Sequence, residues 1–264
     1  MKKLLCVVIL SLCIAASQAH EFWIQSQRYF FAVGEKATLS FVVGEGFVGE
    51  PWKSTAARLV RLEHHQVSGI SDLRAFAKEG ERNQVELELK SEGTHLVVMQ
   101  SNNSFIELDA EKFNNYLKED GLDEAYQQRE KTNSLNKPGR ELYSRYSKLL
   151  LQVGNKRDDT ALKSAGLPLE IVPEKNPYDY KPGELVKFKI LFQGKPLFGA
   201  KVMVWNRKNN QTMAQPVYTM QDGTIEARIS NTGSWMISTV KMIPSKSGEA
   251  DWESYWGSFV FGVQ

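Results

Sequence analysis

The chain has 264 residues, of which 33 are basic and 31 acidic. This near balance argues against a nucleic-acid-binding protein, because such proteins concentrate positive charge. Both cysteines, Cys6 and Cys13, lie near the start of the chain. If that segment is removed, neither a disulfide nor a thiolate metal site can form, so stability must come from a packed core.

The first 19 residues have the three parts of a secretory signal peptide. Lys2 and Lys3 form a basic start, an apolar run follows over 4–16, and small residues end at Ala19. The apolar run is shorter than the roughly 20 residues that cross a bilayer. We therefore predict an exported periplasmic protein, soluble after cleavage, whose mature chain begins at His20.

Residues 20–167 are predicted to form an N-terminal β-sandwich domain. Apolar and charged residues alternate over 84–90, which indicates a strand with one wet face, whereas 94–101 is apolar enough for a buried strand. An antiparallel sheet accounts for both patterns. The glycine-rich segment 44–52 lacks the Gly-Lys-Ser/Thr ending of a phosphate loop, so we interpret it as a turn-rich connection.

A helical insertion is predicted at about 109–150 within this domain. Asp109 can cap a helix in which Phe113, Tyr116 and Leu117 recur at helical spacing, and Gly121 can end it. A second, polar helix is expected over 122–131. The segment 141–153 fits either a helix or a strand.

Residues 168–264 are predicted to form a second, immunoglobulin-like β-sandwich domain. Short apolar segments separated by turn residues are typical of such a sandwich. They lie at 185–192, 201–205, 217–220, 223–229, 234–242 and 256–263. The predicted fold class is mainly β, with two antiparallel sandwich domains.

Cleavage after Ala19 would give His20 a free amine beside its imidazole, and together these nitrogens can chelate one metal ion. Nitrogen donors suit nickel, cobalt, copper or zinc better than calcium or magnesium. One residue rarely suffices, so the fold must bring further ligands. The alternative is that the cleavage site merely happens to precede a histidine.

The remaining histidines are His64, His65 and His95. Neighbouring residues on a strand point to opposite faces, so at most one of His64 and His65 can share a site with His95 and His20. These four are the candidate metal ligands, although each of the three internal histidines equally fits an ordinary strand or turn position. Glu21 can add a carboxylate or lie on the surface.

Enzymatic motifs are missing, since the sequence contains no His-Glu-x-x-His, Gly-x-Ser-x-Gly or dinucleotide-binding glycine pattern. A non-enzymatic protein is therefore expected. One alternative is a carbohydrate- or protein-binding module that uses Trp252 and Tyr255 as surface aromatics. The less favoured alternative is a copper oxidase with a terminal histidine brace, which needs another histidine opposite His20.

Five short motifs recur in a recognisable order: His-Glu-Phe-Trp at 20–23, Gly-Glu-Gly-Phe at 44–47, and the segments 105–109, 143–148 and 251–256. Together they resemble a large domain-of-unknown-function family of bacterial exported proteins, described as periplasmic components of cobalt or nickel uptake systems. The segment 177–205 also resembles the start of immunoglobulin-like modules.

The resemblance implies a β-sandwich protein that handles transition metals, with His20 as a candidate ligand. We expect a periplasmic nickel- or cobalt-binding protein, with copper or zinc as further candidate ions, that passes its metal to a membrane transporter.

Overall fold

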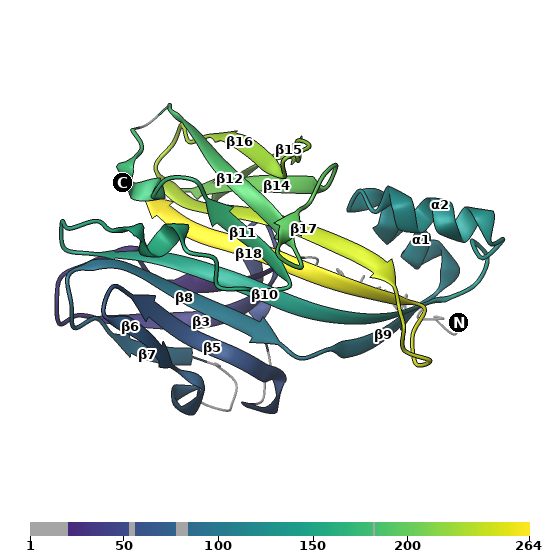
Figure 1. The fold of residues 1–264 in the computed structure, drawn as a ribbon, viewed down its shortest axis with the longest axis horizontal. Coiled ribbons are helices and arrows are strands. Elements are labelled where there is room, and N and C mark those ends of the chain that lie inside the picture. Colours follow the sequence, from purple (N-terminus) through teal and green to yellow (C-terminus); the bar gives the residue numbers. More distant parts are fainter. Residues whose placement is uncertain (1–20, 53–55, 78–83, 182) are drawn as a thin grey trace, which may run out of the picture.

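The computed structural model describes residues 21–52, 56–77, 84–181 and 183–264, so the predicted signal peptide and His20 lie outside the described residues. The predicted mainly β, sandwich-type fold is confirmed. Three sheets account for nearly all of it, and two helices project at one end (Figure 1).

The first sheet has four strands in the order β1-β3-β4, with β7 paired to β3. All its pairings are antiparallel. In β3, Ala37, Leu39 and Phe41 alternate with less buried residues, so one face of the strand enters the core. The strands are β1 Glu21–Ser26, β3 Lys36–Glu45, β4 Val48–Pro51 and β7 Gln84–Glu88.

The central sheet has ten strands in the order β15-β14-β17-β18-β10-β8-β5-β6, with β2 and β9 also paired to β10. Its strands come from both halves of the chain. They are β2 Phe30–Phe31, β5 Leu59–Gln66, β6 Gly69–Asp72, β8 Gly93–Ser101, β9 Ser104–Leu108, β10 Gly139–Val153, β14 Lys201–Lys208, β15 Gln211–Tyr218, β17 Gly233–Pro244 and β18 Trp252–Val263.

The third sheet pairs β12 with β11, β13 and β16, all antiparallel. Its strands are β11 Leu169–Pro173, β12 Leu185–Phe192, β13 Lys195–Pro196 and β16 Thr224–Arg228. Short 3₁₀ turns lie in the connections at Ala56–Arg58, Arg74–Phe76, Asp159–Leu162 and Pro177–Asp179.

The central sheet is shared by two apolar cores. One core joins its first face to the first sheet, through residues such as Leu39, Val97 and Leu151. The other joins its opposite face to the third sheet, through residues such as Leu150 and Phe188. In Figure 1, β11, β12 and β16 accordingly lie above β18 and β10.

The predicted domain boundary at residue 168 lies between β10 and β11, and strands from both sides of it form the central sheet. β10 and β18 lie side by side in parallel from Glu141 opposite Trp252 to Leu149 opposite Val260. The two predicted sandwiches therefore have their middle sheet in common. Not every pairing is antiparallel, because β10 also pairs with β2 in parallel.

The helices α1 Ala110–Glu119 and α2 Asp123–Lys131 form the predicted insertion. The side chain of Asp109 accepts a hydrogen bond from the Lys112 amide at 2.9 Å, and Gly121 follows α1 with a φ of 68°. The expected extent to residue 150 was wrong, because 139–153 is strand β10. The segment 141–153, whose pattern fits either a helix or a strand, is a strand because it pairs with β8, β9 and β18.

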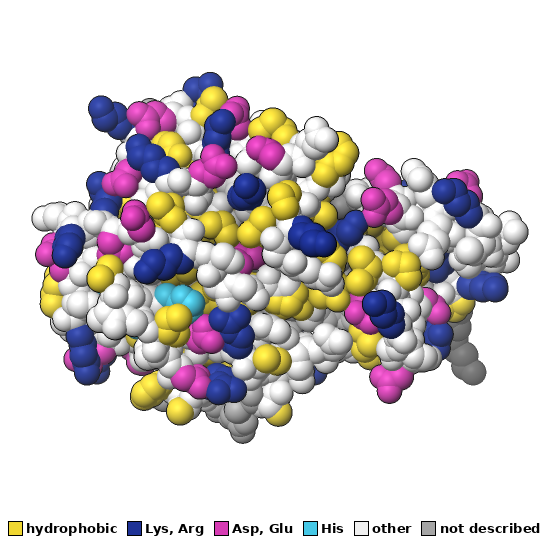
Figure 2. Space-filling view, in the orientation of Figure 1, with side chains coloured by type: hydrophobic (Ala, Val, Ile, Leu, Met, Phe, Trp, Pro, Cys, Tyr) yellow, Lys and Arg dark blue, Asp and Glu magenta, His cyan; other side chains and the backbone are white. Residues whose placement is uncertain are grey.

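The surface of the described chain mixes charges of both signs. Figure 2 shows basic and acidic side chains interspersed over one face of the molecule. Neither helix in the described part has the length and apolar character needed to cross a membrane.

Candidate functional site

His64 and His95 form a buried pair between neighbouring strands. His64 lies on β5 and His95 on β8, and their side chains are 4% and 0% exposed. The His64 Nε2 and His95 Nδ1 atoms are 2.7 Å apart, and the rings stack with centroids 4.9 Å apart. The fold therefore brings two of the four predicted ligands together, as a hydrogen-bonded pair.

The partners of this pair fix its protons. His95 Nε2 lies 3.0 Å from the Ser91 carbonyl oxygen, which can only accept, so His95 carries its proton on Nε2. His95 Nδ1 must then accept from His64 Nε2. Two nitrogens bound to one tetrahedral metal ion at about 2.0–2.1 Å lie roughly 3.3 Å apart. The shorter separation here is that of a hydrogen bond.

Burial keeps both imidazoles neutral. Loss of hydration lowers the pKa of His64 to about 3, with smaller contributions from the nearby His95 and His65. Burial likewise lowers the pKa of His95.

His65 points to the opposite face of β5, as a neighbouring strand residue must. Its Nε2 atom lies 2.8 Å from Glu63 Oε2. Arg61 donates two hydrogen bonds to the same carboxylate, at 2.9 and 2.7 Å. His65 is thus part of a separate polar cluster and does not contribute to the His64–His95 pair.

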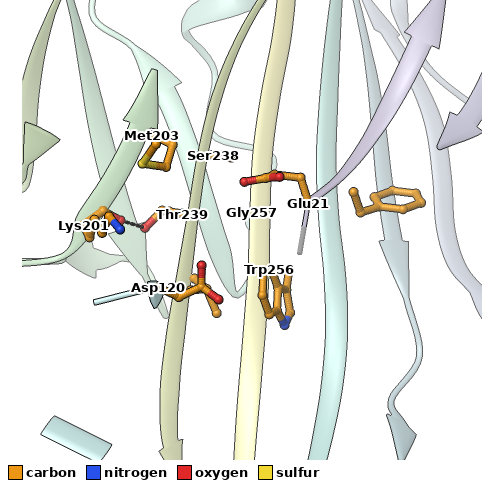
Figure 3. Close-up of a pocket in the computed structure, with 10 residues that line it drawn as sticks. Glu21, Asp120, Lys201, Met203, Ser238, Thr239, Trp256 and Gly257 are labelled. Atoms are coloured by element: carbon orange, nitrogen blue, oxygen red, sulfur yellow. Dashed lines mark hydrogen bonds between the residues drawn. The ribbon is translucent and has the colours of Figure 1, made fainter. Parts of the chain in front are cut away.

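A small cavity lies at the beginning of β1, beside Glu21, the residue that follows His20 in the sequence. It has about 20 Å³ of free space, which is room for one water-sized species. Figure 3 shows Glu21, Asp120 and Trp256 grouped at strands β17 and β18, with Trp256 below Glu21 and beside Asp120. The cavity is lined by Glu21, Phe22, Asp120, Lys201, Met203, Ser238, Thr239, Val240, Trp256 and Gly257.

Two structural elements cover the same face of the central sheet and meet at this cavity. β1 packs against β10 and β18, where the Ile24 amide donates to Ser147 Oγ at 3.2 Å. Further along the strands, α1 and α2 cover Val240 and Met242 of β17. Asp120, the residue that ends α1, is therefore next to Glu21, the first described residue of β1.

Glu21 is the most perturbed carboxyl group of this cavity. Its side chain is 9% exposed, and its Oε2 atom has no hydrogen-bond partner among the described residues. Burial, followed by repulsion from Asp120 and Glu45, raises the pKa of Glu21 to about 8, although Lys201 acts in the opposite direction. A cation in the cavity would relieve this repulsion.

A second buried carboxyl group, Glu141, fixes the helices to the sheet. Glu141 Oε1 accepts hydrogen bonds from Ser254 Oγ and, at 3.3 Å, from the Tyr116 hydroxyl of α1. Trp256 donates to Ser254 Oγ at 3.0 Å and stacks on Tyr116 with ring centroids 5.9 Å apart. Burial raises the pKa of Glu141 to about 7. These contacts determine where the end of α1, and so Asp120, lies.

Lys201 is the basic residue of the cavity lining, and its ammonium group is engaged elsewhere. Its Nζ atom donates to the carbonyl oxygen of Glu119 in the last turn of α1. This is the end of a helix at which a positive charge is favourable.

The cavity and the histidine pair lie well apart. Gly257 beside the cavity faces Tyr146 on β10, whereas His95 faces Leu151. Five residues of strand separate these positions, or roughly 16 Å along β10 at about 3.3 Å per residue. The described residues thus give no three-histidine arrangement at the start of β1, nor a histidine placed to complete a brace there. No group of three His, Cys, Asp or Glu side chains suited to a metal occurs in the described ranges.

The predicted surface aromatics are not a surface platform. Trp252 is 5% exposed and packs in the apolar core beneath the helices. Tyr255 is partly buried, stacked on Tyr146 at 6.0 Å and edge-on to Phe192 at 5.0 Å. The polar neighbours of these residues suggested exposure, but the helices and the third sheet cover them.

The chain shows weak structural likenesses to several solved proteins. No curated protein matches the chain. A Salmonella alpha-2-macroglobulin mutant is similar at 12% identity and a TM-score of 0.25, over 97% of this chain and 16% of that one. Three N-terminal domains of the bacteriophage RB49 highly immunogenic outer capsid protein match at 12% identity and a TM-score of 0.21, over 91% and 59%.

A family model described as a domain of unknown function (DUF4198) matches residues 17–242. This match includes β1, both helices and the lining of the small cavity as far as β17. Because the matched residues make up most of its length, the chain belongs to the DUF4198 family.

Proposed function

We propose that this protein binds a divalent transition metal ion at its processed N-terminus and passes it to a membrane transporter in the periplasm. The ligands are the amine and Nδ1 nitrogen of His20 with the carboxylates of Glu21 and Asp120. Nickel or cobalt is the cargo favoured by the resemblance to uptake components, and copper or zinc suits the same donors.

The observation that carries the proposal is the buried environment of the Glu21 carboxyl group. Its carboxylate is almost fully buried, its Oε2 atom has no partner in the part of the chain that the structure describes, and a second carboxylate lies nearby. Keeping such a group charged is energetically unfavourable. A bound cation removes that cost, and His20 is the adjacent residue in the sequence. An uncleaved leader would leave no terminal amine to complete the chelate.

The donor set fits a transition metal better than calcium or magnesium. Two carboxylates alone would suit a hard cation, but calcium takes six to eight oxygen ligands at most of its sites. The cavity, with about 20 Å³ of space, holds a single ion or water and offers few further oxygens. The two nitrogen donors of His20 would complete the ligand set, and nitrogen donors favour nickel, cobalt, copper or zinc.

The test is isothermal titration of protein that begins at His20 with Ni²⁺, Co²⁺, Cu²⁺ and Zn²⁺. One variant carries an alanine before His20, which removes the free amine from the chelate. A second is Glu21→Gln, which keeps the size of the side chain and removes its charge. Its matched control is Glu86→Gln at an exposed position on β7.

We expect one ion per chain, at least about tenfold weaker binding in the extended and Glu21→Gln proteins, and unchanged binding in Glu86→Gln. A tenfold loss corresponds to about 1.4 kcal/mol. Unchanged affinity in the extended protein would refute the proposed site, provided that thermal unfolding shows each variant to be folded.

A further inference from the structure

A second and larger cavity lies along the same strand, β1, at its other end. It has about 380 Å³ of free space, within the range of small-molecule sites. Strand β1 contributes Gln25, its neighbour β3 contributes Ser40, β7 on β3 contributes Gln84, and β14 contributes Arg207. Phe47, between β3 and β4, forms part of its apolar wall.

An apolar barrier separates the two cavities. Alternate residues of β1 place Glu21 at the first cavity and Gln25 at the second, with Trp23 between them. Trp23 is fully buried and makes an edge contact with Phe47 at 5.9 Å. On β14, Lys201 and Arg207 are divided in the same way by buried Trp205. A ligand in the larger cavity is therefore independent of the metal proposed above.

The described lining of the larger cavity carries a positive charge. Arg207 is the charged residue among those that line it. Its Nη2 atom donates to the neutral amide of Asn210 at 3.3 Å, and its Nη1 atom is buried without an acceptor among the described residues. A guanidinium group offers five donors and pairs best with a planar carboxylate. No acidic side chain of the described lining supplies one.

We propose that this cavity binds a carboxylate attached to a small apolar body. Arg207 supplies the charge that attracts the carboxylate. The side chains of Gln25 and Gln84 supply neutral hydrogen-bonding groups, and Val42 and Phe47 supply a wall for the apolar part. Both a free organic acid and the C-terminus of a peptide have this chemistry.

Three probes separate these sources by isothermal titration of the processed protein, stripped of metal with a chelator that is then removed by dialysis, which keeps metal binding out of the measurement. They are phenylacetate, N-acetylphenylalanine and the uncharged amide of N-acetylphenylalanine. The variant is Arg207→Gln. Its matched control is Lys208→Gln, which removes the same charge from the adjacent exposed residue, on the other side of β14.

We expect both acids to bind, the amide to bind at least about tenfold more weakly, and Arg207→Gln to lose at least about tenfold in affinity for the acids while Lys208→Gln does not. Tighter binding of N-acetylphenylalanine identifies a peptide terminus, and tighter binding of phenylacetate a free acid. Equal binding of acid and amide, equal loss in both variants, or no binding of either acid by folded protein would overturn the proposal. Loss of metal binding in the separate metal titrations has no bearing on this result.

Discussion

The buried histidine pair predicts a specific loss of stability in acid. The folded-state pKa of His64 is about 3, against an ordinary value of 6.5, so the unfolded chain binds a proton more readily. Stability supplied by the neutral ring is therefore complete above pH 6.5 and is lost progressively between pH 6.5 and pH 3. The full loss is about 5 kcal/mol, and the share lost by pH 5 is about 2 kcal/mol.

The assay is urea unfolding of wild type and His64→Gln between pH 5 and pH 8, followed by tryptophan fluorescence. Glutamine does not titrate in this range, so the difference in unfolding free energy between the two proteins should fall by about 2 kcal/mol from pH 8 to pH 5. Groups that do not contact His64 contribute equally to both proteins and cancel in this difference. Glu141, for example, acts in the opposite direction, because its raised pKa of about 7 makes the folded state less stable as pH rises from 4.5 to 7.

A direct NMR titration of the His64 ring provides the control. We expect its carbon-bound ring proton to keep the shift of a neutral imidazole down to pH 5. A midpoint near 6.5, or a pH-independent difference between the two proteins, would refute the reasoning.

Two further predictions concern packing. Lys148 and Glu170 form an ion pair in which both side chains are 1% exposed, so Lys148→Met should cost about 3–5 kcal/mol by leaving a buried carboxylate without its counter-ion. Glu170→Gln in the same chain removes that charge and keeps an oxygen that can accept from the Gly166 and Leu167 amides, so it should recover part of the loss. Additive losses in urea unfolding would contradict this. A Cβ atom on Gly139 would lie 2.2–2.5 Å from the Phe113 ring, so Gly139→Ala should destabilise the protein by about 1–3 kcal/mol, whereas Gly248→Ala, which meets no atom within 4 Å, should have little effect. Equal unfolding midpoints for the two alanine variants would count against the packing described.

Local patterns predicted most strands and both helices, because their signals lie within one element. The alternation over 84–90 and the cap at Asp109 are of this kind. The parallel contact between β10 and β18 has no such signal, since its partners are more than 100 residues apart in sequence. The segment 141–153 carries spacing that suits a helix equally well, and only its neighbours in the sheet select the strand.

The candidate site was predicted in part. The end of the predicted signal peptide drew attention to His20 and Glu21. Asp120, in contrast, belongs to a run of acidic residues that is typical of a solvated helix face. Its position at the cavity depends on docking of α1 through Tyr116 and Glu141, contacts that no spacing in the sequence reveals. His64 and His95, 31 residues apart, were predicted as candidate ligands, and the structure shows them hydrogen-bonded to one another.

The most direct test of the proposed metal site is native mass spectrometry of the protein recovered from its own cellular compartment. One spectrum gives both the mass of the mature chain and the mass of anything bound to it. The proposed function predicts a chain that begins at His20 and carries one nickel or cobalt ion, which is absent when an extra residue precedes His20. A chain that begins at His20, is folded and binds no transition metal even when one is added would contradict it.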